Sequence, residues 1–215
     1  SPDADRNLLA EGCNHESIVC VGNVMIDTLF EHLPAARVLD VAARFGLEPG
    51  AYAVLTLHRP SNVDDPAVLS RILGAITQVA ERLPVIFPVH PRTQRQLHAP
   101  GLNERRRPTA LTVCDPLGYL EFLSLSSNAR LVLTDSGGLQ EESTALGIPC
   151  LTLRENTERP ITIEVGTNVL VGTDPARILA EAERALAPRT SPSPVPHLWD
   201  GKTAPRIVEA VRLRL

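Results

Sequence analysis

The sequence lacks long apolar runs, paired cysteines and clustered positive charge, and each absence excludes a class of protein. No segment approaches the ~20 apolar residues that a membrane-spanning helix needs. No charged-then-apolar signal pattern opens the chain. We therefore expect a cytoplasmic protein with no membrane partner.

Cysteines give no sign of a metal or redox site. Cys13, Cys20, Cys114 and Cys150 occur singly, without a C-x-x-C pair. Three of them lie in or beside apolar, strand-like runs, so we expect small buried hydrophobic residues. The sequence predicts no metal and no other cofactor.

Charge argues against nucleic acid as a partner. The formal net charge is -4, and binding to nucleic-acid phosphates needs clustered positive charge. The one dense basic spot, residues 105–107, stands just before Pro108, and a solvated loop is favoured there over a binding patch.

Short β-branched runs alternate with longer amphipathic ones, which is typical of a parallel sheet with helices on both faces. Strands are expected at 17–22, 52–57, 84–89, 110–114, 130–134, 149–153 and 168–171. Helices are expected at 35–46, 64–82, 116–127, 137–146, 174–187 and 203–214. The pattern predicts an α/β fold: a doubly wound, Rossmann-like, mostly parallel sheet.

The two ends of the chain differ from this middle part. Residues 6–12 resemble the tail of a helix closed by Gly12, so residues 1–16 are interpreted as the end of an interdomain segment, and we expect the chain to begin mid-protein. Residues 17–187 form the predicted Rossmann-like domain. Residues 188–215 hold a proline-rich crossing, which cannot be helical, and a last helix.

The glycine pair after the run at 130–134 is the strongest candidate site, because ligands of open α/β sheets bind beyond the carboxyl ends of strands. Ser136, Gly137 and Gly138 would open a helix there, and its free N–H groups and dipole suit a phosphate or diphosphate. The run matches neither a Walker loop nor G-x-G-x-x-G. On the motif alone, a tight turn capped by Ser136 is the favoured alternative.

Ionisable side chains surround this junction. Glu141 and Glu142 point about 100° apart on a helix, so only one need face a ligand, where it could accept the hydroxyls of a ribose. His58, Arg59 and His90 follow strands, while Arg159 lies in the segment NTERP. The arginines suit a diphosphate, with surface ion pairs as the alternative. A lone histidine is more often structural.

Six segments together resemble the non-hydrolysing UDP-N-acetylglucosamine 2-epimerases. These are GNVMIDTL, TLHRPSNVDD, PVIFPVHPRT, TDSGGLQEESTALGIPCLTLRENTERP, GTNVLVGTD and LWDGKTAPRIVEA, and they run in order over nearly the whole chain. The resemblance implies an isomerase of polysaccharide biosynthesis that interconverts UDP-GlcNAc and UDP-ManNAc by elimination and re-addition of UDP. It also implies a GT-B fold of two Rossmann-like domains, with this chain as the C-terminal, UDP-binding one.

By the same resemblance, the diphosphate lies on Ser136, Gly137 and Gly138, and the ribose on Glu142. Phe122, which its helical spacing alone would place in a core, matches an aromatic near uracil. Arg159 and His58 match basic residues at the phosphates and the cleft, with His58 as a helper in catalysis.

Parts of the family pattern differ or are missing. Pro60-Ser61-Asn62 stands where many members have HRxEN, and ERPIT replaces ERPE. The acidic catalytic residues and the GTRPE loop belong to the N-terminal domain, so we expect a missing domain or partner chain. A homodimer also stays open. The alternatives are a UDP-sugar-binding module without turnover and half of a GT-B glycosyltransferase, against which HRPSN and TERP weigh.

Overall fold

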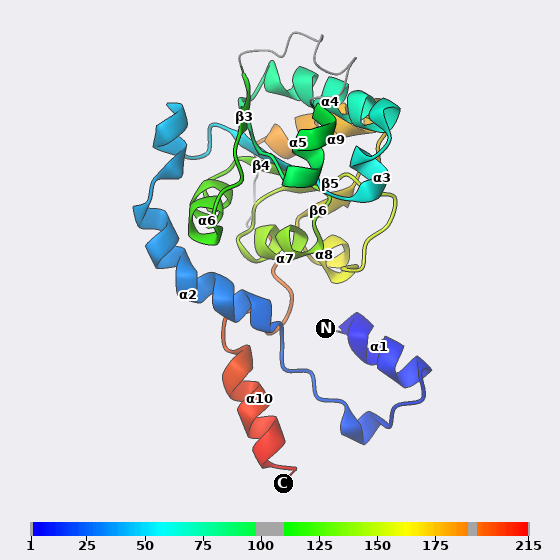
Figure 1. The fold of residues 1–215 in the computed structure, drawn as a ribbon. Helices are drawn as coiled ribbons and strands as arrows, with labels where there is room; N and C mark the ends of the chain where they lie inside the picture. The colour runs from blue at the N-terminus through cyan, green and yellow to red at the C-terminus, as the bar shows by residue number, and fades with distance from the viewer. Residues whose placement is uncertain (1, 98–109, 189–192, 215) are drawn as a thin grey trace.

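A parallel sheet of six strands forms the centre of the protein (Figure 1). The structure is a computed structural model that describes residues 2–97, 110–188 and 193–214; the arginine triplet at 105–107 lies outside them. The strands are β1 Ala53–Thr56, β2 Val85–Pro88, β3 Leu111–Cys114, β4 Leu131–Thr134, β5 Cys150–Thr152 and β6 Asn168–Leu170. Their order in the sheet is β3-β2-β1-β4-β5-β6, so the chain changes direction of winding between β1 and β4, which confirms the doubly wound fold.

Helices surround the sheet. They are α1 Pro2–Ala10, α2 Val24–Val38, α3 Pro60–Val63, α4 Pro66–Ala80, α5 Pro91–Leu97, α6 Tyr119–Ser127, α7 Gly137–Ala145, α8 Ile161–Glu164, α9 Pro175–Leu186 and α10 Thr203–Arg212. Two short 3-10 helices span His15–Ser17 and Val41–Phe45. The predicted helices at 64–82, 116–127, 137–146, 174–187 and 203–214 are all present within a few residues.

The same dipeptide, Asp-Pro, starts the two helices that cover one face of the sheet. Asp65 accepts a hydrogen bond from the N–H of Ala67 (2.8 Å), and Asp174 accepts one from Ala176 (3.1 Å). A proline follows each aspartate at the first helical position, where its missing N–H costs nothing. These caps fix where α4 and α9 begin, so that their apolar faces meet the sheet.

Successive side chains of each strand point to opposite faces of the sheet, which divides the core into two layers. Leu55 of β1 and Phe87 of β2 point toward α4 and α9, in a cluster with Ile76 and Ile178. The intervening residues, such as Val54, point to the opposite face, where α6, α7 and the second 3-10 helix pack. Strands buried on both faces explain why the sequence shows apolar runs rather than a polar–apolar alternation.

The predicted strand at 17–22 is wrong. Residues 18–23 are extended in part but pair with no strand of the described sheet, and Val19 is 48% exposed. Cys13 and Cys20 lie in the same connecting segment and are exposed, against the expectation of buried cysteines, whereas Cys150 is buried in β5. An apolar run becomes a strand only where a neighbouring strand supplies hydrogen-bond partners.

The helix predicted at 35–46 is also wrong in extent. It begins at Val24, where Asn23 accepts a hydrogen bond from Met25 (3.0 Å), and it ends at Val38. Asp40 then adopts a left-handed conformation (φ 41°) that separates α2 from the 3-10 helix. The buried face of α2 packs against α6, and this packing outweighs the weak local pattern.

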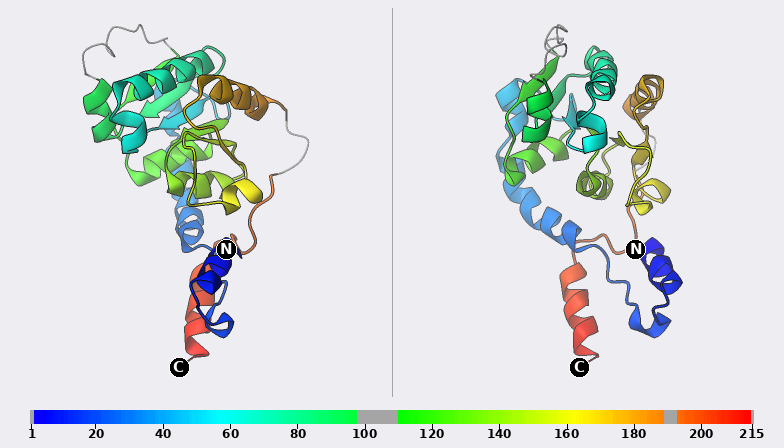
Figure 2. Two further views of the ribbon diagram at one scale, coloured as in Figure 1. Left: turned by 90° about the vertical axis from the view of Figure 1, so that its right-hand side faces the viewer. Right: turned by 45° about the vertical axis from the view of Figure 1, so that its right-hand side comes forward.

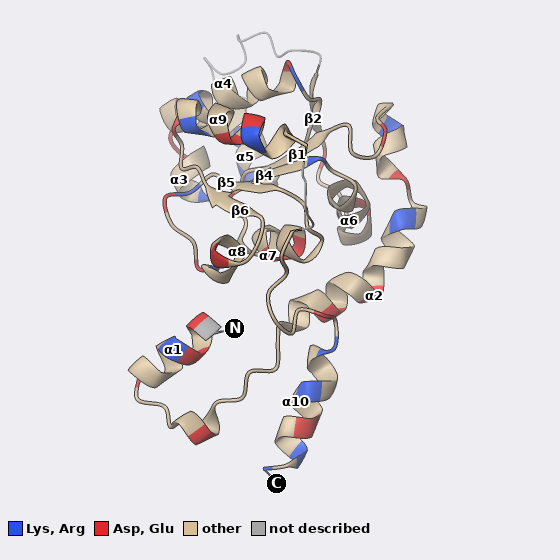
Figure 3. Cartoon of the chain, turned by 180° about the vertical axis from the view of Figure 1, so that it is seen from behind, with Lys and Arg blue, Asp and Glu red and all other residues tan. Residues whose placement is uncertain are grey.

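The chain ends project from the α/β body. In both views of Figure 2, α1 and α10 extend away from the sheet on the same side. Asp27 of α2 anchors α10, since it accepts hydrogen bonds from the N–H groups of Thr203 (3.0 Å) and Ala204 (2.7 Å). Within the described residues, no helix has the length and apolar character to cross a membrane. Acidic and basic segments are interspersed along the helices (Figure 3).

Truncation of the core should be far more costly than truncation of α10. Leu55→Ala removes a fully buried side chain at the centre of the sheet and should lower the free energy of unfolding by about 2–5 kcal/mol. Val208→Ala, at a position that is 67% exposed, should change it by less than about 0.5 kcal/mol. Urea denaturation of both variants measures the difference; equal losses would contradict this core.

Candidate functional site

A cavity of about 210 Å³ opens beyond the carboxyl ends of β1, β2 and β3 and reaches the start of α7, next to the point where the strand order reverses. Its lining combines polar and apolar side chains: Thr56, Leu57, His58, Pro88, His90, Pro116, Leu117, Phe122, Ser136 and Leu139. We call it the switch-point cavity. It brings together four residues singled out from the sequence, His58, His90, Phe122 and Ser136, although they come from four separate segments.

The start of α7 forms one wall of the cavity. Ser136 is the N-cap residue, but its side chain makes no capping hydrogen bond, and its own N–H is taken by Thr134 Oγ1 (2.9 Å). A Cβ on Gly137 would meet no atom within 4 Å, and one on Gly138 would meet only the end of Met25, at 3.4 Å. The fold itself therefore does not require glycine at position 137. A phosphate bound at the helix N-terminus would require it, because a side chain there would block its approach to the backbone N–H groups.

His58 pairs with a carboxylate that sequence reasoning missed. Its Nδ1 lies 2.7 Å from Oδ1 of Asp135, whose side chain is fully buried at the end of β4. The backbone N–H groups of His58 and Arg59 donate to the same carboxylate (3.0 and 2.9 Å to Oδ2). Burial alone would raise the pKa of Asp135, but the hydrogen bonds from His58 and Arg59 outweigh it and lower that pKa.

Asn62, the last residue of the HRPSN segment, also binds this carboxylate. It is buried in α3, where its Nδ2 donates to Oδ2 of Asp135 (3.2 Å) and to the carbonyl oxygen of Leu153 (2.8 Å). It thereby joins the loop after β1 to the ends of β4 and β5. The sequence signal for Asp135 is a charged residue directly after a buried strand.

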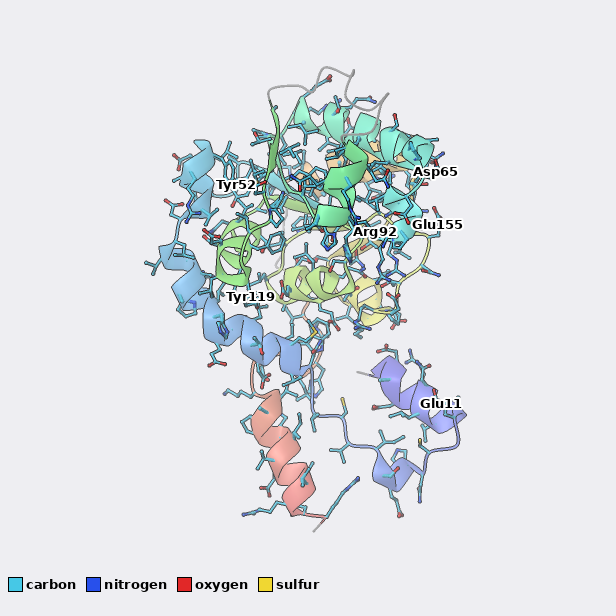
Figure 4. All side chains as sticks on the ribbon, viewed as in Figure 1. Glu11, Tyr52, Asp65, Arg92, Tyr119 and Glu155 are labelled. Atoms are coloured by element: carbon cyan, nitrogen blue, oxygen red, sulfur yellow. The ribbon has the colours of Figure 1, made fainter. Side chains whose placement is uncertain are left out.

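Adjacent glutamates of α7 take up different environments. Glu141 is buried, and its Oε1 accepts from Asn23 Nδ2 and lies 3.0 Å from Nε of Arg159. Glu142 is half-buried on another side of the helix, close to Tyr119, which starts α6 beside α2 (Figure 4). Burial, together with the charge of Glu141, raises the pKa of Glu142 to about 7.

The two arginines lie outside the switch-point cavity. Arg59 is within 3.6 Å of Glu158, and Arg159 pairs with Glu141. Arg159 lines a second hollow of about 420 Å³ that also includes Asp3 and Asn7 of α1 and Trp199. Arg59 thus has the surface ion pair that the sequence left as its alternative, whereas Arg159 pairs with a buried carboxylate of α7.

Buried amide groups hold the loop that carries Arg159. The Oε1 atom of Gln140 accepts from Thr157 Oγ1 (2.6 Å) and Asn168 Nδ2 (3.1 Å), and Thr157 Oγ1 in turn accepts from the N–H of Arg159 (2.9 Å). This network fixes the loop after β5 against the first turn of α7. Among the described residues, no group of three or more His, Cys, Asp or Glu side chains is placed to hold a metal ion.

A family model matches nearly the whole chain. The model described as UDP-N-acetylglucosamine 2-epimerase matches residues 1–212. The chain belongs to this family. UDP-N-acetylglucosamine 2-epimerases of Methanococcus maripaludis and Methanocaldococcus jannaschii are 42% and 40% identical over 85% and 95% of the chain.

Solved structures of the UDP-N-acetylglucosamine 2-epimerase family share the fold. The crystal structure of the Methanocaldococcus jannaschii UDP-GlcNAc 2-epimerase, in complex with UDP-GlcNAc and UDP, matches 96% of the chain with a TM-score of 0.82 and 39% identity. The chain corresponds to 59% of that structure and to 52% and 57% of the two archaeal relatives. It therefore spans a little over half the length of the relatives that it matches.

The raised pKa of Glu142 makes stability depend on pH. Between pH 4.5, its ordinary pKa, and about 7, the folded chain holds more protons than the unfolded chain, so the free energy of unfolding falls as pH rises. Glu142→Gln should remove this loss and be about 1–3 kcal/mol more stable than the wild type at about pH 8, but close to it at about pH 5. Urea denaturation at both pH values measures the effect.

Glu31→Gln, at an exposed position of α2, is the matched control and should leave the pH dependence unchanged. An equal gain for Glu142→Gln at both pH values would show that a packing change, rather than the charge of Glu142, is responsible.

Proposed function

We propose that this chain is the UDP-binding part of a UDP-GlcNAc 2-epimerase and that UDP binds across the switch-point cavity. The observation that carries the proposal is the uncapped N-terminus of α7, with open space at Gly137, directly beside a cavity at the topological switch point. Helix N-termini in this position bind phosphate groups through backbone N–H groups and the helix dipole. The related archaeal enzyme crystallised with UDP-GlcNAc and UDP supports the same ligand.

Each part of UDP has a candidate partner. Ser136, Gly137 and Gly138 would bind the diphosphate, and Phe122 would pack near uracil at the apolar end of the cavity. Glu142 would accept the ribose hydroxyls as a carboxylate. Its pKa of about 7 makes this acceptor pH-sensitive.

Basic side chains would complete the phosphate site. Arg59 and Arg159 pair with Glu158 and Glu141. They would have to exchange part of these ion pairs for the diphosphate, while His58 and His90 already line the cavity. The Arg59–Glu158 pair is exposed, so its exchange costs little. Glu141 is buried and would keep the hydrogen bond from Asn23 if Arg159 turned to the diphosphate.

Epimerisation needs more than UDP binding. Elimination of UDP requires a base near C2 of the sugar, and the carboxylates of α7 are assigned to the nucleotide end. We therefore infer a partner, the N-terminal domain of the relatives. This domain would cover the apolar residues that are exposed on α10 and the neighbouring segment, namely Val19, Ile207, Val208 and Val211. Cytoplasmic location and a homodimer stay predictions.

A different sugar is the second candidate. The UDP-2,3-diacetamido-2,3-dideoxy-D-glucuronate 2-epimerase of Pseudomonas aeruginosa is 38% identical over 84% of the chain. Both substrates share UDP, so this chain would bind the common part, and assays with each sugar separate the two. Two further alternatives are a UDP-binding module without turnover and half of a glycosyltransferase. Both would bind the same nucleotide, but neither would epimerise the sugar.

Gly137→Asp should abolish UDP binding while the chain stays folded. The new carboxylate would lie against the diphosphate, but it meets no protein atom within 4 Å at its Cβ and suits a helix N-terminus. Isothermal calorimetry with UDP measures the loss. Gly74→Asp, where a Cβ also meets nothing within 4 Å, is the matched control and should bind as the wild type does. UDP affinity unchanged in both variants would refute the site.

The chain alone should show almost no exchange of the sugar C2 proton, and a separately produced N-terminal domain of a relative should restore some. NMR of UDP-GlcNAc in D2O follows the exchange. Val208→Asp together with Val211→Asp should reduce the restored rate, because two charges would be placed in the inferred interface. Full exchange by the chain alone would contradict the inferred division of labour.

A further inference from the structure

The Nδ1 atoms of the two histidines in the switch-point cavity have opposite hydrogen-bond partners, an acceptor for His58 and a donor for His90. Nδ1 of His58 lies 2.7 Å from Oδ1 of Asp135. Nδ1 of His90 accepts the backbone N–H of Arg92 at 3.2 Å, which closes the first turn of α5. The ring centroids are 5.8 Å apart, so both imidazoles face one small volume with different protonation requirements.

An ionised carboxylate can only accept hydrogen bonds, whereas a backbone N–H can only donate. His58 must therefore carry its proton on Nδ1 to bond with Asp135. His90 must leave Nδ1 unprotonated to bond with Arg92, so its proton resides on Nε2. In the neutral forms, the free Nε2 of His58 is an acceptor, and that of His90 is a donor.

The carboxylate of Asp135 is itself held in place. Its Oδ2 accepts from the N–H groups of His58 (3.0 Å) and Arg59 (2.9 Å) and from Nδ2 of Asn62 (3.2 Å). Oδ1 accepts from the N–H of His58 (3.1 Å) besides facing Nδ1. Because the side chain is fully buried, water offers no competing partner, and the oxygen that faces the imidazole cannot turn away.

We propose that Asp135 is a positioning residue that fixes His58 in the tautomer protonated on Nδ1, so that Nε2 presents a lone pair as the proton acceptor of the cavity. When Nε2 takes a proton, its lone pair forms the new N–H bond, and the donor keeps the electron pair of the bond that breaks. The resulting imidazolium is stabilised by Asp135, and the proton returns by the reverse step. His90 supplies a hydrogen-bond donor beside it.

The use of this acceptor on a UDP-sugar rests on the proposed function, but the tautomers of the two rings do not. The test therefore needs no substrate. The 215-residue chain is labelled with ¹⁵N, and the ring nitrogens are observed by NMR at a pH above the titration of both imidazoles. Signals of His58 and His90 are assigned by their loss in His58→Gln and His90→Gln.

In the wild type we expect a protonated Nδ1 and an unprotonated Nε2 for His58, and the reverse for His90. A His58 protonated on Nε2, or a mixture without preference, would overturn the proposal without any variant. This result alone is decisive if the substitution below prevents folding.

Asp135→Asn should invert the tautomer of His58. The single amide oxygen is expected at the Oδ2 position, where three donors converge, which turns the NH₂ group toward His58 Nδ1 and requires an acceptor there. His90 in the same spectrum should not change. Asp174→Asn, the same substitution at the N-cap of α9, should leave both rings unchanged.

A purely structural role for Asp135 predicts something different. In that case Asp135→Asn would lower stability, while His58 kept its proton on Nδ1. That outcome would overturn the positioning role of Asp135. It would not bear on UDP binding, which calorimetry on the wild type tests independently.

Discussion

The buried carboxylate of Asp135 is the interaction on which the rest of the site depends. A charged group with no access to water is tolerated only when hydrogen bonds replace its hydration. Here donors from His58, Arg59 and Asn62 supply them. The same bonds tie the loop after β1 to the end of β4, and they aim the histidine ring into the cavity.

The strand order makes this interaction available. β1 and β4 are neighbours in register, with Thr56 paired to Thr134, so the residues that follow them emerge side by side. The cavity opens there, with His58 after β1 and Ser136 at the start of α7 in its lining. A parallel sheet therefore places an imidazole, a buried carboxylate and an uncapped helix N-terminus within a few residues of one edge.

The first turns of α7 concentrate polar groups at a cost to stability. Glu141 and Glu142 repel each other, and burial raises the pKa of both carboxyls. Arg159 offsets part of this at Glu141, and Gln140 ties the arginine's loop to the helix. Such local conflict is typical of functional sites, where binding rather than stability determines the side chains. The polar groups in the first turns of α7 would then gain further hydrogen-bond partners from a bound ligand.

Most strands and helices, and the abrupt strand-to-helix junction at Ser136, could be predicted from the sequence, because they depend on local periodicity and on glycines next to a strand end. The sequence could not determine which apolar runs pair, and the run at 17–22 found no neighbouring strand. Nor could it connect His58 with Asp135, which are 77 positions apart. Their contact exists only because the sheet places β1 beside β4, and that adjacency is a property of the tertiary structure.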